Sequence, residues 1–287
     1  SFGVQDYNLH IQTAINRIQP FELVQLATER SRLAGYTSVS HDLVFGLPFQ
    51  SIADIQFSIQ KTIALDPDRI SLYSYAHVPW LKGNGQRGFK DEDVPKDEEK
   101  QALYLCAKDM LLQNGYYEIG MDHFARAHDA LYTAYKQGRL HRNFMGYTAS
   151  KTTLMIGLGI SSISDSGTAY AQNEKELDDY YVKIENGQLP VVKGHLLTEE
   201  DLYIKQHILD LMCRFKTSWK EHELRLCDKR KILENLEELH SDGLLHLDDD
   251  SVQLLEEGKM FVRNACMAFD LRLKRNQQHK RIFSSTI

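Results

Sequence analysis

Short strand-like runs alternate with helical segments over roughly the first 76 residues. The strand-like runs are 1–5, 36–46 and 69–76. Between the last two, four isoleucines recur at spacings of three and four, which places them on one face of a helix over 51–65: Ile52, Ile55, Ile59 and Ile63. Pro67 ends that helix, because proline disfavours helical geometry in the residue before it. Strands that alternate with helices of this length predict parallel βαβ units.

The strand around Asp42 carries a carboxylate close to its carboxyl end. The two-residue period of a strand separates two faces, with Val39, Leu43 and Phe45 on one and Ser40, Asp42 and Val44 on the other. In an α/β barrel the first face would meet the outer helices and the second would point into the barrel. Such barrels place their chemistry at the carboxyl ends of the strands. Asp42 is therefore a candidate site residue, and a structural carboxylate bonded to the following loop is the alternative.

A glycine-rich and charged stretch over 81–100 reads as an exposed loop. It contains a formal G-x-G-x-x-G from Gly83 to Gly88. The dinucleotide fingerprint must open a helix directly after a strand, which the flanking residues do not support, so we interpret the match as coincidence. A clear helix follows at about 97–113 and ends at Asn114-Gly115.

The pattern changes character beyond about residue 196. Helices are expected at about 198–214, 218–226, 229–241 and 255–272, with a small hairpin at 243–247 and 251–254. Thr198 and Asp201 resemble a capping box at the start of the first of these helices. We therefore predict an α/β domain over 1–196 and a mainly helical, winged-helix-like domain over 197–287. From Leu196 onward there are 17 acidic and 15 basic residues, so the basic footprint of a DNA-binding domain is missing.

Composition and charge exclude several classes of function. The net charge of −6 argues against a nucleic-acid partner. No apolar run reaches the ~18 residues of a membrane helix, and no secretory signal is visible, so we expect a cytoplasmic protein. We also expect a monomer. The four cysteines are too far apart for the short metal-ligand spacings and are interpreted as reduced, packed thiols: Cys106, Cys213, Cys227 and Cys266.

Two segments combine cationic, polar and aromatic side chains. One is Gly120-Met121-Asp122-His123-Phe124-Ala125-Arg126, and the other is Leu140-His141-Arg142-Asn143-Phe144-Met145-Gly146-Tyr147-Thr148. Arginine supplies fixed forks for carboxylates, and aromatic rings supply stacking faces. These segments predict a pocket for a flat, anionic, partly apolar ligand, with four candidate contacts: His123, Arg126, His141 and Arg142.

Both segments resemble the signature blocks of the oxygen-independent coproporphyrinogen III oxidases, which are radical S-adenosylmethionine enzymes. The resemblance runs in order over essentially the whole chain. It includes Ser1-Phe2-Gly3-Val4-Gln5-Asp6, Asp42-Leu43-Val44-Phe45-Gly46-Leu47-Pro48, Tyr75-Ala76-His77, Gly157-Leu158-Gly159-Ile160-Ser161 and Tyr170-Ala171-Gln172-Asn173.

The resemblance implies a reaction and its cofactors. Such enzymes cleave S-adenosylmethionine at a [4Fe–4S] cluster to give a 5′-deoxyadenosyl radical, which takes a hydrogen atom from a substrate propionate. Loss of carbon dioxide and an electron leaves a vinyl group, and two such events convert coproporphyrinogen III to protoporphyrinogen IX in heme synthesis. The protein positions the reactants, since the cofactor carries the hard chemistry. An electron donor and an acceptor are required, and the sequence identifies neither.

The resemblance also implies site residues. The family's S-adenosylmethionine contacts fall on Gln5, Arg17, Asp42 and Ala76. The neighbours of a second S-adenosylmethionine fall on Val44, Tyr73, Phe144, Met145 and Ile163. Tyr73 stands where the family commonly has phenylalanine. Met145 stands where it commonly has glutamine, whose amide bonds methionine cannot reproduce.

One family element has no counterpart in these 287 residues. The C-x-x-x-C-x-x-C motif that holds the cluster is absent, and none of the four cysteines can replace it. Ser1 opens the chain on a strand-like run. The expectation is therefore the C-terminal part of a longer oxidase, with residues 1–196 forming an incomplete radical-SAM-type α/β barrel and its substrate-side extension. This chain alone is expected to be inactive.

Two other hypotheses remain open from the sequence. A related heme-chaperone-like branch binds heme instead of oxidising a porphyrinogen. It usually carries a Tyr-Glu-hydrophobic-Ser-Asn-Phe-Ala segment, whereas this chain has Met121-Asp122-His123. The last hypothesis is a binding module that uses the C-terminal helices, which the acidic balance disfavours.

Overall fold

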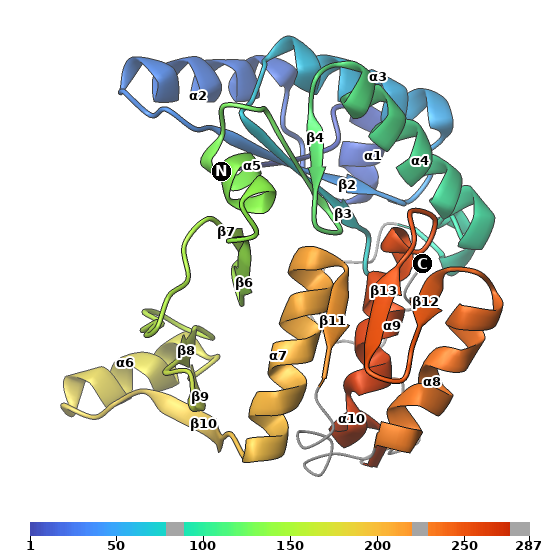
Figure 1. Cartoon of the computed structure of the whole chain (residues 1–287). Helices are drawn as coiled ribbons and strands as arrows, with labels where there is room; N and C mark the ends of the chain where they lie inside the picture. The colour runs from blue at the N-terminus through green and yellow to red at the C-terminus, as the bar shows by residue number, and fades with distance from the viewer. Residues whose placement is uncertain (79–88, 220–228, 276–287) are drawn as a thin grey trace. The chain divides into compact units, whose positions relative to one another are not determined.

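The computed structural model describes residues 1–78, 89–219 and 229–275, which fall into two compact units (Figure 1). The first unit runs from Ser1 to Gly138 and the second begins at Arg139. The boundary expected at 196/197 lies inside the second unit, between its strand β10 and its helix α7. No described helix is long and apolar enough to cross a membrane.

The first unit is built on a five-stranded sheet in the order β1-β2-β3-β5-β4. β1 (Phe2–Gln5), β2 (Ser40–Phe45) and β3 (Arg69–Ser74) are parallel, as predicted. β5 (His123–Ala125) is antiparallel to both of its neighbours, β3 and β4 (Tyr117–Ile119). The helical segments of this unit are α1 (Leu9–Ala14), α2 (Phe21–Leu33), α3 (Ile52–Ala64), η1 (Asp91–Asp93), α4 (Asp97–Gln113) and α5 (Ala130–Lys136).

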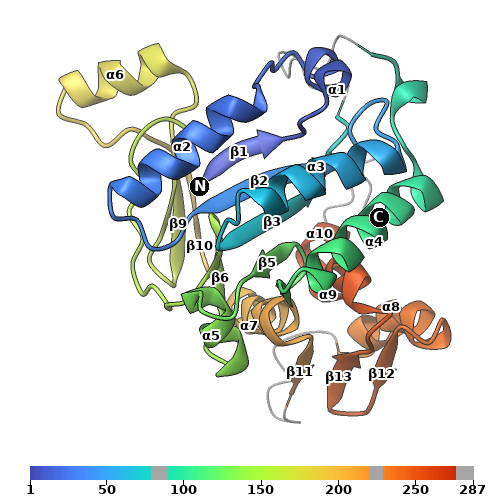
Figure 2. The same ribbon diagram turned by 90° about the horizontal axis from the view of Figure 1, so that it is seen from above.

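Helices α2, α3 and α4 cover one face of the parallel strands (Figure 2). The helix predicted at 51–65 is confirmed as α3, but its buried stripe is shifted from the predicted one. Ile55 and Ile59 are fully buried, whereas Ile52 is 40% exposed. Small polar residues, Ser58 and Thr62, occupy the other edge of the stripe and are buried against neighbouring elements. The apolar periodicity therefore identified the helix and misplaced the edge of its contact face.

His41 lies on this covered face, and its burial has a consequence for stability. The imidazole is fully buried, with Nε2 2.9 Å from Thr28 Oγ1. Burial lowers the pKa of His41 to about 4. An unfolded chain binds this proton near pH 6.5, so stability is fully present above that pH and is lost as the pH falls towards 4.

We expect the loss attributable to His41 to be about 3 kcal/mol between pH 7 and pH 4. The measurement is urea unfolding of wild type and His41→Asn at several pH values across this range. The variant should be less stable than wild type at pH 7 and show a flatter dependence on pH. An equally steep dependence in both proteins would contradict the assignment.

The second unit combines small sheets with helices. Its first half contains the hairpin β6 (His141–Asn143) and β7 (Gly146–Thr148), and the antiparallel sheet β8 (Ile163–Asp165), β9 (Ala169–Asn173) and β10 (Val191–Leu196) with α6 (Leu177–Glu185). Its second half contains α7 (Glu199–Arg214), β11 (Lys216–Ser218), α8 (Lys229–Ser241), β12 (Leu245–Leu247), β13 (Ser251–Leu254), η3 (Lys259–Phe261), α9 (Val262–Phe269) and α10 (Leu271–Arg275).

The second half of this unit combines helices with a small antiparallel sheet. The capping box of Thr198 and Asp201 opens α7, and the predicted hairpin is β12–β13, joined by β11 as a third strand. The helix expected over 255–272 is divided into η3, α9 and α10. The G-x-G-x-x-G stretch, Cys227 and most of the helix expected at 218–226 lie outside the described residues. The first residue of that expected helix, Ser218, instead ends β11.

Candidate functional site

The predicted carboxylate lies on the face of the first sheet opposite to α2, α3 and α4, here termed the open face. Along β2, the buried residues His41, Leu43 and Phe45 alternate with the half-buried Asp42 and Val44. This confirms the predicted separation of two faces. A charged group is tolerated at Asp42 because its face of the strand is not packed into the core.

Neighbouring strands place four residues in one row across this open face. Asp42 pairs with Gly3 of β1 on one side and with Ser71 of β3 on the other. His123 of β5 pairs with Ser71, and its Nε2 lies 3.4 Å from Ser71 Oγ. The His123 ring also packs edge-on against the ring of Tyr73, with centroids 5.9 Å apart. Three candidate residues from separate segments therefore share one surface.

Gln5 and Arg17 converge on Gly3, beside Asp42. Arg17 donates from a terminal guanidinium nitrogen to the Gly3 carbonyl at 2.5 Å. A Cβ added at Gly3 would lie 2.8 Å from Gln5 Nε2 and 3.1 Å from the Arg17 guanidinium, so only glycine leaves both groups in place. Asp42 Oδ2 accepts a hydrogen bond of 2.7 Å from Ser1 Oγ. Gln5, Arg17 and Asp42 thus form one cluster at the edge of the sheet.

The chemistry of this cluster fits S-adenosylmethionine. A carboxylate can accept from ribose hydroxyls or an amino group, and a guanidinium can pair with the carboxylate of the methionine part. Val44 lies two residues beyond Asp42 on the same face. Ala76 is exposed in the segment after β3, where the Tyr75 amide donates to the Phe45 carbonyl at 2.9 Å.

His123 forms a close pair with the preceding residue. Its Nδ1 lies 2.5 Å from Asp122 Oδ1, and both side chains are buried. A carboxylate only accepts, so the contact assigns a proton to Nδ1 of the imidazole. Asp122 therefore fixes the orientation of a ring that borders the open face of the sheet.

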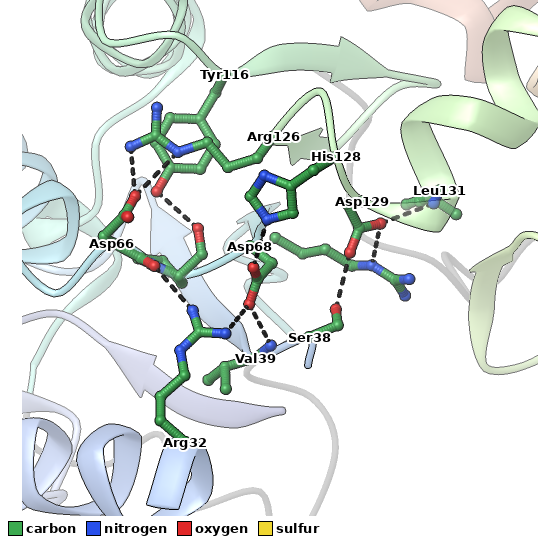
Figure 3. A network of polar contacts seen from close by, with 12 residues as sticks. Arg32, Ser38, Val39, Asp66, Asp68, Tyr116, Arg126, His128, Asp129 and Leu131 are labelled. Atoms are coloured by element: carbon green, nitrogen blue, oxygen red, sulfur yellow. Dashed lines mark hydrogen bonds and ion pairs between the residues drawn. The ribbon is translucent and has the colours of Figure 1, made fainter. Parts of the chain in front are cut away.

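Arg126 lies away from this face, although it follows His123 by only three residues. Because β5 runs antiparallel to β3, the residues after His123 lead back to the amino end of β3. There the Arg126 Nε donates to Asp66 Oδ1 at 3.0 Å, and its guanidinium lies 3.9 Å from the centre of the Tyr116 ring (Figure 3). The structure does not bring Arg126 together with His123.

Two buried carboxylates that sequence reasoning missed complete the network at these amino ends. Asp68 accepts from the Val39 amide at 2.7 Å and pairs with Arg32 at 2.6 Å (Figure 3). Burial alone would raise the pKa of Asp68, but hydrogen bonds from His128, the Val39 amide and Arg32 outweigh it and lower that pKa. Asp129 is the second buried carboxylate. For Asp68 the signal in the sequence is the acidic turn 66–68, where Pro67 also marks the end of a helix.

The second charged and aromatic segment forms the β6–β7 hairpin of the second unit. His141 and Arg142 lie on β6, and the Arg142 guanidinium lies 4.6 Å from the centre of the Tyr147 ring. Phe144 and Met145 occupy the turn and are 53% and 86% exposed. Burial, with Lys151 and Lys205 nearby, lowers the pKa of His141.

A cavity of about 540 Å³ lies within the second unit beside this hairpin. Arg142 and Phe144 line it, and the Phe144 ring packs edge-on against Tyr170 at 5.1 Å. Lys205 of α7 also lines it, 3.2 Å from Asp165 and 4.8 Å from the centre of the Tyr170 ring. Its wall is apolar where α7 contributes Ile204, Ile208, Leu209 and Met212. Lys205 was missed because a lone lysine in a helix usually marks a solvated face.

The described cysteines lie apart from other possible metal ligands. Among the described residues, no three Cys, His, Asp or Glu side chains are grouped as metal ligands would be. Burial raises the pKa of Cys213 to about 11 and that of Cys266 to about 12, as expected for packed thiols. Cys106 is half-buried.

Comparisons with known proteins place these features in a family. No protein-family model matches the chain. It is 38% identical over its whole length to the oxygen-independent coproporphyrinogen III oxidase of Synechocystis sp., of which it spans 63%. The oxygen-independent coproporphyrinogen III oxidase of Thermostichus vulcanus is 37% identical over all of this chain and 89% of its own length.

A solved structure gives the same result. The Escherichia coli coproporphyrinogen III oxidase, described as a radical SAM enzyme, is 37% identical. It matches 94% of this chain and 63% of its own, with a TM-score of 0.86. The α/β fold class predicted from the sequence is confirmed by this likeness.

Proposed function

The chain belongs to the family of oxygen-independent coproporphyrinogen III oxidases, and from that premise we propose that its first unit binds S-adenosylmethionine on the open face of the sheet. The observation that carries the proposal is the cluster of Gln5, Arg17 and Asp42 around Gly3. When bound, this cofactor supplies the radical chemistry that removes a hydrogen atom from a substrate propionate.

The residues of the first unit bind and orient this ligand. Asp42 accepts hydrogen bonds from its ribose or amino group, and Arg17 pairs with its carboxylate. Ala76 and Val44 border it, and the Tyr73 and His123 rings form the neighbouring wall. We propose that His123 contacts the substrate. Arg126 is left out, because its guanidinium is held by Asp66 and Tyr116.

We propose that the second unit contacts the substrate. The substrate we propose is coproporphyrinogen III, a flat tetrapyrrole that carries propionates and occurs in the names of the relatives. The cavity beside the β6–β7 hairpin offers an apolar wall together with Arg142 and Lys205. His141, Phe144 and Met145 lie on the same hairpin, and Ile163 begins β8. A second S-adenosylmethionine bordered by these residues would lack an amide partner at Met145.

The [4Fe–4S] cluster of this chemistry needs ligands that these 287 residues do not offer. We therefore expect the chain on its own to bind S-adenosylmethionine without cleaving it. Cleavage and substrate oxidation should require a C-x-x-x-C-x-x-C segment supplied with the chain.

Titration calorimetry of the 287-residue chain with S-adenosylmethionine tests the first part of the proposal. One-site, saturable binding is expected. The wild-type chain failing to bind at millimolar ligand would overturn it.

The oxidase activity is tested on a fusion that supplies, ahead of Ser1, the part of the Synechocystis relative that this chain does not cover. The reconstituted fusion should convert coproporphyrinogen III to a product with vinyl groups. Tight heme binding without any vinyl product would instead favour the heme-chaperone-like branch.

A further inference from the structure

A buried pair of polar side chains joins the carboxyl ends of β1 and β2. Asp6 directly follows β1 and is fully buried, and Gln50 lies in the loop after β2 and is 4% exposed. Gln50 Nε2 donates to Asp6 Oδ2 at 2.8 Å. A buried carboxylate and a buried amide cost free energy unless their hydrogen bonds are made. The partners of Asp6 and Gln50 therefore show which parts of the backbone this pair holds.

Gln50 bonds the backbone where β2 ends. Its Oε1 accepts from the Gly46 amide at 2.7 Å, and its Nε2 also donates to the Val44 carbonyl at 3.2 Å. Gly46 has a φ of +76°, a conformation that favours glycine. The Gln50 amide thus holds the turn at Gly46 that follows β2 and the carbonyl of Val44, a proposed neighbour of the ligand.

Asp6 bonds the backbone where β1 ends. Its Oδ1 accepts from the Asn8 amide at 2.7 Å and from Asn8 Nδ2 at 2.8 Å, while Gln12 Nε2 donates to the Asp6 carbonyl at 2.9 Å. Burial raises the pKa of Asp6, and these hydrogen bonds oppose that effect. The preceding residue, Gln5, has a φ of +67°. A non-glycine residue holds that conformation only where its surroundings enforce it.

We propose that the Asp6–Gln50 pair is a positioning device that sets Gln5 and Val44 for ligand binding. Neither side chain is placed against the ligand. Gln50 holds the Val44 carbonyl directly, whereas Asp6 directly follows Gln5 and holds the Asn8 amide of the turn beyond it. Their mutual hydrogen bond links the two strand ends. This role rests on the proposed binding of S-adenosylmethionine to the open face.

The geometry allows the two groups to be exchanged. Gln50→Glu would set two carboxylates against each other, and Asp6→Asn would turn an amide towards donors that need an acceptor. The double variant Asp6→Asn/Gln50→Glu restores an amide–carboxylate bond in the opposite sense. It keeps an acceptor for the Gly46 amide but removes the donor to the Val44 carbonyl.

The test is calorimetric titration of S-adenosylmethionine into the 287-residue chain, with amide hydrogen exchange at Gly46 and Leu47 as the second readout. Each single variant should raise the dissociation constant about tenfold and speed exchange at these amides. The double variant should recover part of the affinity lost in the single variants, because it restores the contact between the two side chains but not the bond to the Val44 carbonyl.

Thr28→Val is the matched control, because it removes a buried hydrogen bond to His41 on the covered face. It should destabilise the chain without changing ligand affinity. If Thr28→Val lost as much affinity as the single variants, the pair would have only a structural role. The same conclusion would follow if the double variant bound no better than the single variant with the lower affinity. Binding absent in the wild type would overturn the proposed function and this role with it, whereas unchanged exchange with intact binding would overturn this role alone.

Discussion

Replacing Asp129 with alanine is expected to lower the free energy of unfolding by about 3 kcal/mol. The Asp129 side chain is 1% exposed and pairs with Arg69 Nε at 2.6 Å. It also accepts from Ser38 Oγ at 2.8 Å and from the Leu131 amide at 2.7 Å, which caps α5. Alanine would leave a half-buried guanidinium and a helix end without their acceptor.

Urea unfolding monitored by circular dichroism measures this loss, and Asp66→Ala is its control. Asp66 also pairs with an arginine, Arg126, but its carboxylate is 71% exposed. An exposed ion pair contributes at most about 1 kcal/mol. Equal losses in the two variants would contradict the view that burial, and not the count of ion pairs, decides their contribution.

The largest functional effect is expected for Asp42→Asn. Loss of the carboxylate should weaken S-adenosylmethionine binding roughly thirtyfold, because a hydrogen bond to a charged group contributes about 2 kcal/mol. The fold should be unaffected, since Asp42 is half-buried on the open face and the variant keeps its shape.

Titration calorimetry measures the affinity, and thermal unfolding shows that the chain is intact. Ser40→Ala is the control, because Ser40 lies on the same face of β2, two residues nearer its amino end. It should bind as wild type does. If Asp42→Asn also bound normally, the ligand would not reach this strand.

The elements that could be predicted are those with a strong local signal. Helix α4 spans the range predicted for it and ends at the Asn114-Gly115 stop, and the two faces of β2 follow its alternation. The division of the chain was harder to foresee. The composition of the chain changes near residue 196, yet the two units separate before Arg139. Helix α7, which follows residue 196, contacts β6, which precedes it, so both belong to one unit.

The candidate site was predictable in kind but not in arrangement. Asp42 was found from its place near the end of a strand, and the resemblance supplied Gln5 and Arg17. The position of Gly3 beneath them depends on the pairing of β1 with β2, which no local pattern encodes. The buried pair of Asp6 and Gln50 joins residues 44 positions apart, and only the folded chain brings them together.

Arg126 directly follows strand β5, so its contacts affect the position of His123 on the sheet. The contacts of Arg126 with Asp66 and Tyr116 favour the observed alignment of β5 with β3. A slip of one residue would turn the imidazole to the opposite side of the sheet. A substitution at Arg126 is therefore expected to resemble the loss of a site residue, because it removes contacts at the end of the strand that carries His123.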